Sequence, residues 1–432
     1  MLQWKPDLAQ YTKALSLAIS ESSKECSETL LAQIAARLLG SPCPKELLQN
    51  RWNGAESSLL LGFCSNIVRL TVKLDQIDES DIGTRFDLFR HILTEAGSSK
   101  HLMHLEYLKI DAQEIAEWSN PYHAISLLLE ASPRLRTFIL KGKQVIQMLI
   151  NDYQLDIDKL RPALGSLNEI HLLDWMLCKG NNDSTVLSQI IMEARELRTF
   201  RYILDQEHEW KEGIERSKVP YPPSFFIMAL KAAKANLRHL TLDFNRELYL
   251  TPSASISSST FIAPEQMHEF VQLQSLEIDQ FCYCRHQLGK DKLGDAWGHS
   301  SYLADLLPVT VKNLTIFWKQ SEGIYTCLNC ILYLGKRAVA GDFPRLECVQ
   351  VDIPVDYRMS NDFFLNYDIH DPHWEGSEET EGDLERISAE VEGQALKIKE
   401  AFAGSGVVIK LRTWYLDGWV PLLDDRGVRI LD

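Results

Sequence analysis

Apolar residues recur along the chain in a six-residue pattern, LxxLxL, whose first, fourth and sixth positions are apolar. Polar residues alternate with them, which is typical of a β-strand that has one face in a core and the other in water. Clear copies occupy residues 67–72, 105–110, 135–140, 167–172, 197–202, 237–242, 273–278, 311–316 and 346–351. The string LRTWYL from Leu411 is a further candidate, and KALSLAI from Lys13 predicts an earlier strand.

Stretches with helical spacing lie between these predicted strands. Apolar residues recur there at intervals of three and four, as on the buried side of an α-helix. Such stretches include residues 85–96, 123–131, 186–194 and 225–233. The repeating unit is therefore strand, loop, helix, loop, with equivalent positions about 30–40 residues apart. A strand of this kind cannot bury its apolar face alone and must stack on the next copy.

The sequence thus predicts an α/β fold, a leucine-rich-repeat-like solenoid with a curved parallel sheet on the concave side and helices on the convex side. A doubly wound sheet is less favoured, because its strands are buried on both faces and read as continuous apolar runs. Four regions are predicted. They are an N-terminal helical cap with a candidate first repeat at 1–66, the solenoid at 67–352, an acidic insertion with a surface helix at 353–405, and a C-terminal strand or cap at 406–432.

Composition narrows the class of partner. The 432 residues are 45% apolar and 24% charged, with a formal charge of −15, so we expect a folded chain with an extensive core. The negative charge disfavours nucleic acid, which needs clustered Lys and Arg. No apolar run suits a membrane span, and the first residues lack the apolar region of a secretory signal. Nine scattered cysteines favour a reducing compartment, so we expect a cytoplasmic or nuclear protein.

Alternation along each strand places the fifth and seventh positions of the pattern on the concave sheet face. This face is predicted to pass from basic, through apolar, to acidic along the chain, and an apolar centre with charged flanks is typical of a polypeptide-binding surface. The predicted partner-binding residues are Lys73, Lys109, Asp111, Ile139, Lys141, His171, Leu173, Arg201, Ile203, Asp243, Glu277, Asp279, Phe317, Gln350 and Asp352. Two other interpretations stay open: these are ordinary solvated residues, or a slipped register buries the apolar ones.

Two groups of residues have the types found in metal sites. One combines CxC and CxxC near a histidine, as zinc requires, in Cys282, Cys284, Cys327, Cys330 and His286. The helical spacing around its CxxC pair instead favours small buried thiols. The other offers mixed nitrogen and oxygen ligands within a predicted loop, in Asp368, His370, Asp371, His373 and Glu375. Because a flexible loop holds a metal poorly, we predict no metal and no cofactor.

The opening string KPDLAQYTKALSLAI, the alternation of helices with LxxLxL strands and the uneven repeat length resemble the leucine-rich-repeat region of fungal F-box proteins. The resemblance covers nearly the whole chain. In that family a helical F-box binds the Skp adaptor of a cullin ubiquitin ligase, and the repeats capture a substrate. Here five residues precede Pro6, where the family has its F-box, and PKELLQNRW from Pro44 lacks the apolar helix that should follow. Two explanations stay open: the protein lacks an F-box, or its F-box lies upstream of Met1. Binding of the Skp adaptor is not expected of these 432 residues, because they contain no visible F-box.

These observations favour a non-enzymatic protein-interaction module that captures a protein on its concave face. The resemblance implies that it is the substrate-recognition part of an F-box type ubiquitin ligase. A scaffold without a ligase link is the first alternative, and a metal-dependent hydrolase is the second. No GxSxG elbow, P-loop, GxGxxG after a strand or HExxH helix occurs, so we predict no catalytic residue.

Overall fold

The structure is a computed structural model of the chain. It describes residues 13–19, 64, 66–74, 102–112, 121–146, 157–177, 186–204, 221–244, 261–283, 300–317, 324–353, 393–415 and 418–421. The chain divides into two compact units. Unit 1 comprises Met1–Tyr221, Ala229–Leu237 and Glu247–Ala254; unit 2 comprises Pro222–Met228, Arg238–Arg246 and Ser255–Asp432.

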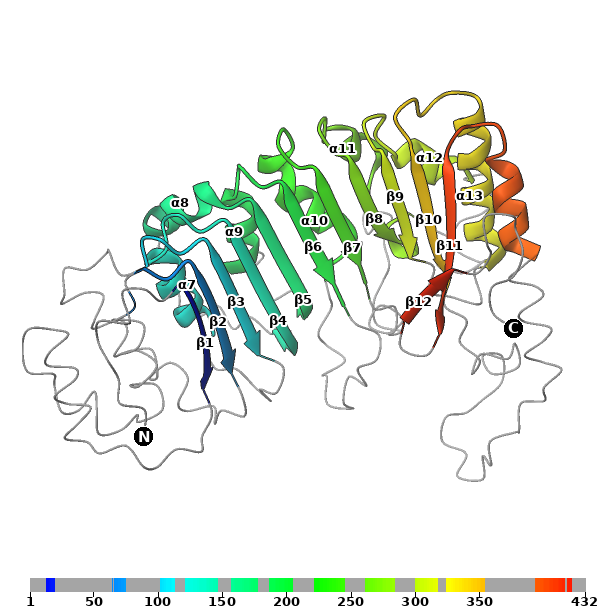
Figure 1. The fold of residues 1–432 in the computed structure, drawn as a ribbon. Helices are drawn as coiled ribbons and strands as arrows, with labels where there is room; N and C mark the ends of the chain where they lie inside the picture. Colours follow the sequence, from blue (N-terminus) through cyan, green and yellow to red (C-terminus); the bar gives the residue numbers. More distant parts are fainter. Residues whose placement is uncertain are drawn as a thin grey trace, which may run out of the picture. The chain divides into compact units, whose positions relative to one another are not determined.

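Unit 1 is an α/β unit with a parallel sheet. Its strands follow one another in sequence order as β1 (Ala14–Ile19), β2 (Arg69–Leu74), β3 (Tyr107–Ala112), β4 (Thr137–Ile146), β5 (Glu169–Leu177) and β6 (Thr199–Ile203). Its helices are α7 (Pro121–Glu130), α8 (Ile157–Ser166), α9 (Val186–Glu193) and the 3₁₀ helix η2 (Leu230–Ala233). The helices lie on one face of the sheet, and no described helix covers the other face (Figure 1).

Unit 2 has the same construction. Its strands are β7 (His239–Asp243), β8 (Ser275–Asp279), β9 (Asn313–Phe317), β10 (Cys348–Ile353) and β11 (Val408–Tyr415), all parallel, followed by the antiparallel β12 (Gly418–Pro421). Its helices are α10 (Pro223–Ala229), α11 (Pro264–His268), η5 (Gln280–Cys282), α12 (Tyr302–Leu306) and α13 (Ile324–Val339), and residues 393–401 are also helical. The prediction of an α/β fold with parallel strands and helices is confirmed in both units.

The LxxLxL pattern forms the core between sheet and helices, as predicted. In all nine copies the residues at positions one, four and six are buried, the most accessible being Leu346 at 6%. In unit 2 an aromatic group adds to this core, because Phe226 of α10 packs edge-to-face on Phe225 and on Phe244, with ring centroids 5.4 and 5.7 Å apart. Burying such side chains is the main favourable term in the stability of each unit.

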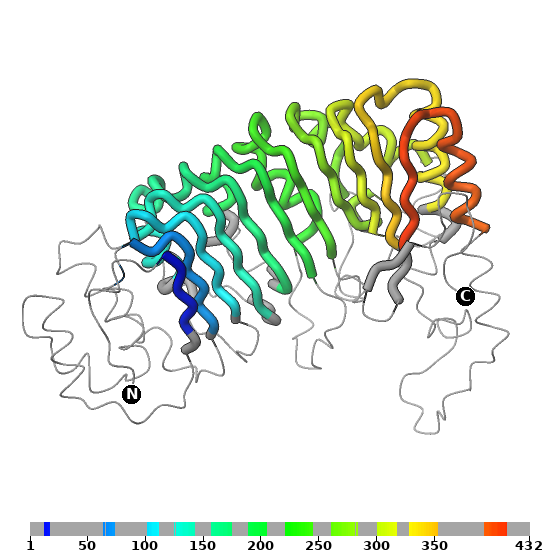
Figure 2. Tube along the Cα trace, viewed as in Figure 1, coloured from blue at the N-terminus to red at the C-terminus, as the bar shows by residue number. Residues whose placement is uncertain are grey.

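The second position of the pattern links successive coils through its backbone. The carbonyl of Val68 accepts hydrogen bonds from the N–H groups of Glu106 and Tyr107, at 2.9 and 3.1 Å. The same double acceptance recurs at Lys13, Glu106, Arg136 and Asn168 in unit 1, and at Arg238, Gln274 and Lys312 in unit 2. Each strand therefore starts at the same level as its predecessor, as the tube in Figure 2 shows within each unit. The bonds to Lys13 confirm the strand predicted from KALSLAI.

Several predicted elements are found and others fall elsewhere. The helical stretches 123–131, 186–194 and 225–233 correspond to α7, α9, and α10 with η2. The predicted register at Leu411 is wrong. Leu411 was predicted to be the first position of a copy, but it pairs with Val351, which is a sixth position. The last parallel strand therefore begins earlier, at Val408. The predicted stretch 85–96 and the acidic segment 375–392 lie outside the described residues.

Candidate interaction surface

The sheet face that no described helix covers, called the open face here, carries the third, fifth and seventh positions of the pattern. Strand pairing aligns these positions in rows that run across each unit. In unit 1 the row of fifth positions is Thr71, Lys109, Ile139, His171 and Arg201, and the row of seventh positions beyond β1 is Lys73, Asp111, Lys141, Leu173 and Ile203. All ten are partly or fully exposed.

Three aliphatic side chains of unit 1 lie on this open face. Leu173 of β5 and Ile203 of β6 are paired in register, and Ile139 of β4 pairs with His171 in the neighbouring row. Each is partly exposed, whereas the adjacent Leu172 and Tyr202 are completely buried. The strand register therefore directs these three side chains outward, and the alternative of a slipped register does not hold in the structure.

Basic side chains lie beside the aliphatic ones on this face, and several form no ion pair with a described residue. Lys109 forms an ion pair with Asp111 at 3.1 Å, and the guanidinium of Arg69 lies 4.4 Å from the ring centroid of Tyr107. Within the described part of the chain, no ion pair joins Lys73, Lys141 or Arg201 to a carboxylate. Lys141 pairs in register with Leu173, so a cation lies directly beside the aliphatic group.

His171 lies at the centre of this surface and is largely enclosed. Its side chain is 16% exposed, and its Nε2 lies 3.8 Å from Oε2 of Glu169 without a hydrogen bond from any described residue. Burial lowers the pKa of His171, the positive charge of Arg201 lowers it further, and Glu169 acts in the opposite direction. The imidazole is therefore neutral at pH 7, and can donate one hydrogen bond and accept another.

An irregularity in the sheet adjoins the same residues. Between Lys141 and Gln144 the pairing of β4 with β5 shifts by one residue, which marks a β-bulge. Opposite the bulge, Asp174 is the one described residue other than glycine with a positive φ, at 60°. Such bulges and left-handed residues are enriched beside functional sites, because they re-aim the neighbouring side chains. Leu173 lies immediately before this irregularity, at the last regularly paired position.

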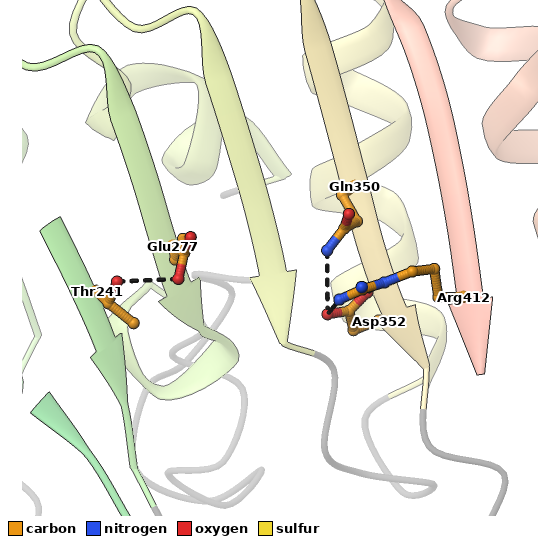
Figure 3. Close-up of polar contacts among 5 residues, drawn as sticks. All are labelled: Thr241, Glu277, Gln350, Asp352 and Arg412. Carbon is orange, nitrogen blue, oxygen red and sulfur yellow. Dashed lines mark hydrogen bonds and ion pairs between the residues drawn. The ribbon is translucent and has the colours of Figure 1, made fainter. Parts of the chain in front are cut away.

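The open face of unit 2 carries polar contacts between neighbouring strands (Figure 3). Thr241 of β7 donates a hydrogen bond to Glu277 of β8 at 2.9 Å. On β10, Asp352 accepts a hydrogen bond from Gln350 at 3.3 Å and forms a bidentate ion pair with Arg412 of β11. The hydrogen bond to Asp352 raises the pKa of Arg412. These residues bind one another, so they offer a partner fewer unpaired groups than their counterparts in unit 1.

Two predicted partner-binding residues are buried and must be corrected. Asp279 and Asp352 have no exposed surface. Asp279 accepts a hydrogen bond from the backbone N–H of Phe244 at 3.1 Å, and Arg412 covers Asp352. Nearby donors thus stabilise both carboxylates away from water. The other predicted residues of unit 2, Asp243, Glu277, Phe317 and Gln350, are partly exposed.

The sequence pattern missed the basic residues of β11. Val408, Lys410 and Arg412 occupy the third, fifth and seventh positions there, so basic side chains end the open face of unit 2, in place of the predicted acidic ones. The alternation of side chains in VVIKLR could have indicated this register. The structure agrees with that alternation, because Leu411 is 4% exposed and Val408 is 56% exposed. Arg69, Tyr107 and Glu169, at third positions in unit 1, were also left out of the prediction.

The predicted metal groups receive no support where the structure describes them. Cys282 is fully buried and its Sγ approaches the carbonyl of Leu242 at 3.9 Å, as a structural thiol does. Cys330 is buried in α13. The described residues contain no group of three His, Cys, Asp or Glu side chains that could hold a metal ion. The residues from Asp368 to Glu375, and Cys284 and His286, lie outside the described ranges.

The comparisons with known proteins add no relative. No protein-family model and no curated protein matches this sequence. Among the described helices, none has the length and apolar character to cross a membrane. The function must therefore be inferred from the chemistry of the open face.

Proposed function

We propose that the chain is a leucine-rich-repeat-like solenoid that acts as a protein-interaction module and captures a polypeptide on the open face of unit 1. The observation that carries the proposal is the partly exposed aliphatic group of Ile139, Leu173 and Ile203 on a sheet face that no described helix covers. Core residues on the same strands are fully buried, so these three were not left outside by poor packing. The proposal gives no residue a catalytic role.

The chemistry of the surface suits a polypeptide. Interaction surfaces commonly combine a few apolar anchors with a polar and charged rim that excludes water and fixes orientation. Leu173 and Ile203 supply adjacent anchors, and Lys141, Arg201 and His171 supply the rim. The sheet also holds these side chains on rigid, hydrogen-bonded strands, which lowers the entropy cost of binding.

A narrower form of the proposal rests on the resemblance to fungal F-box proteins. It holds that the captured protein is a substrate delivered to a ubiquitin ligase. The string KPDLAQYTKALSLAI, which carries part of that resemblance, includes β1, the first coil of the sheet. Pull-down of the chain with the Skp adaptor tests this form. Stoichiometric binding supports it, and no binding leaves a scaffold without a ligase link as the better reading.

The general proposal is tested by placing a charge among the anchors. We expect Leu173→Asp or Ile203→Asp to abolish capture of the proteins that co-purify with the wild-type chain, while the thermal transition stays within a few degrees. Val271→Asp is the matched control, because Val271 is 61% exposed in unit 2 and lies off the sheet. Capture is compared by quantitative mass spectrometry. Partner sets that are identical for wild type and Leu173→Asp contradict the proposal, as does unfolding of both variants.

A further inference from the structure

We infer that the polypeptide bound by unit 1 is an acidic segment in which Asp or Glu residues flank aliphatic ones. The inference rests on the proposed function and names the class of its partner. It commits the site to the part of the open face formed by β4, β5 and β6, where Lys141, Leu173, Ile203, Arg201 and His171 come together.

This face is basic, whereas the chain as a whole is acidic. The protein has a formal charge of −15, with 60 acidic and 45 basic residues. At the third, fifth and seventh positions of β2 to β6, basic residues nevertheless outnumber acidic ones by five to two: Arg69, Lys73, Lys109, Lys141 and Arg201 against Asp111 and Glu169. A basic face on an acidic chain attracts acidic groups locally, although the net charge of the chain repels them.

The basic side chains beside the aliphatic group are those that lack an ion pair within the described ranges. Asp111 forms an ion pair with Lys109, and Oε2 of Glu169 lies 3.8 Å from Nε2 of His171. Among the described residues, neither Lys141 nor Arg201 has an ion pair. A partner carboxylate could therefore bind either of them without first displacing a carboxylate of the described residues.

The spacing fits an extended peptide that crosses the strands. Lys141, Leu173 and Ile203 follow one another along the row of seventh positions on three adjacent strands. Neighbouring strands are about 4.8 Å apart, so this row spans about 10 Å, which three residues of an extended chain cover. An acidic residue placed on Lys141 thus puts an aliphatic residue within reach of Leu173 and Ile203. Arg201, two residues before Ile203 on β6, can bind a second carboxylate.

His171 gives the site a neutral hydrogen-bonding group. Its Nε2 is enclosed and lacks a hydrogen bond from the described residues, while the ring lies in register between Ile139 and Arg201. A partner that covers this nitrogen without bonding to it would incur a desolvation cost. A peptide can avoid that cost, because its backbone and carboxylates supply both donors and acceptors.

Other anionic ligands fit the site less well. Single-stranded nucleic acid needs several accessible aromatic side chains for its bases to stack on, and among these five residues the one aromatic ring, that of His171, is only 16% exposed. An anionic membrane attracts a protein through several lysines and arginines, each worth about 1 kcal/mol, and the net charge of this chain opposes that attraction. Both alternatives remain as outcomes of the test.

The test is selection from a random library of displayed 12-residue peptides on the full chain. We expect the selected sequences to be enriched in Asp and Glu next to Leu, Ile or Val. The affinity of a selected peptide should fall about tenfold or more in the double variant Lys141→Glu, Arg201→Glu, and by a similar factor when Gln replaces each Glu in the peptide. The matched control is Arg134→Glu with Lys231→Glu, two exposed cations of unit 1 that lie outside the open face; it should bind within about twofold of wild type.

The outcomes separate the inference from the proposed function. Selected peptides that lack acidic residues, yet lose binding in Leu173→Asp, overturn the inference and leave the function standing. If the selection yields no peptide whose binding depends on Leu173, both the inference and the proposed function are overturned. The same Lys141 and Arg201 variant is tested with single-stranded DNA and with phosphatidylserine vesicles. Binding of either that equals the peptide's and disappears in the variant assigns the face to polyanions and also overturns the inference.

Discussion

Arg412 on β11 and Asp352 on β10 are paired in register and joined by two hydrogen-bonded ion contacts, at 2.7 Å from Nε and 2.5 Å from Nη2. The carboxylate has no exposed surface, whereas the arginine side chain keeps 31% of its own. The guanidinium therefore covers the carboxylate from the solvent side. A second donor, the amide of Gln350, completes the set at 3.3 Å.

Removal of this arginine should strongly destabilise unit 2. In Arg412→Met the buried carboxylate of Asp352 retains, among the described residues, only the hydrogen bond from Gln350, and we expect the free energy of unfolding to fall by about 2–4 kcal/mol. Urea denaturation measures the change. The double variant Asp352→Asn, Arg412→Met should recover at least half of the loss, because no charge remains buried. A double variant as unstable as the single one would show that the arginine acts through packing alone.

A second arginine in unit 2 provides the contrast. Arg337 of α13 forms ion pairs with Asp305 of α12 and with Asp342, and its guanidinium lies 6.0 Å from the ring centroid of Tyr333. All of these groups are substantially solvated, so water and salt screen the pairs. We expect Arg337→Met to lower the free energy of unfolding by less than about 1 kcal/mol. A loss as large as that of Arg412→Met would contradict the role that we give to burial.

Adjacent residues of β4 test the strand register. Leu140 is completely buried and Ile139 is partly exposed on the open face. Leu140→Ala should therefore cost about 2–5 kcal/mol of stability through lost burial and the cavity that it leaves. Ile139→Ala should cost less than about 1 kcal/mol, because water already contacts that side chain. Denaturation curves of the two variants give the comparison, and equal losses would place both side chains in the core.

Helix packing in unit 2 depends on the absence of a side chain at Gly335 of α13. A Cβ there would lie 2.8 Å from the carbonyl oxygen of Ala401 and 2.9 Å from the ring of Phe402. Gly335→Ala should therefore destabilise the protein by about 1–3 kcal/mol, although alanine favours helix. Gly165 of α8 has no atom within 4 Å of its Cβ position. Gly165→Ala should instead stabilise by about 0.5–1 kcal/mol, and thermal denaturation should order the two variants on opposite sides of wild type.

The contribution of His171 to stability should depend on pH. Burial lowers the pKa of this residue in the folded chain below its ordinary value of 6.5. Between these two pKa values the unfolded chain holds the proton that the folded chain excludes, so stability declines as the pH falls through 6.5. The stability difference between wild type and His171→Asn should consequently shrink from pH 8 to pH 5.5. Urea denaturation at both pH values measures this stability difference. A difference that grows in acid would contradict the expected direction of the pH dependence.

The buried part of the fold could be predicted from the sequence because it depends on a short period. Positions one, four and six lie within a single strand, and the alternation of side chains assigns them to the core. The same period gave the outward direction of Ile139, Leu173 and Ile203. It failed at β11 because Gly406, with a φ of 77°, occupies the first position of that copy, where the others have an apolar residue. LRTWYL then matched the pattern better than the true register did.

The state of the acidic residues could not be predicted in this way. Whether a carboxylate is buried depends on donors that are distant in sequence. Asp279 is bound by the N–H of Phe244, 35 residues away, and Asp352 by a guanidinium 60 residues away. The β-bulge opposite Asp174 likewise arises from the pairing of two strands and has no motif of its own. Tertiary contacts thus decide which open-face residues are available to a partner.

The final strand of the sheet runs in the opposite direction. β12 takes up the side of β11 that β10 leaves free, and its Pro421, paired with Arg412, has no N–H group to donate. An uncapped strand is a template on which a second molecule can add, and rows of such molecules grow into filaments. The short, four-residue β12 with its proline hinders that growth at this margin, so addition of a strand to β11 would first require β12 to detach.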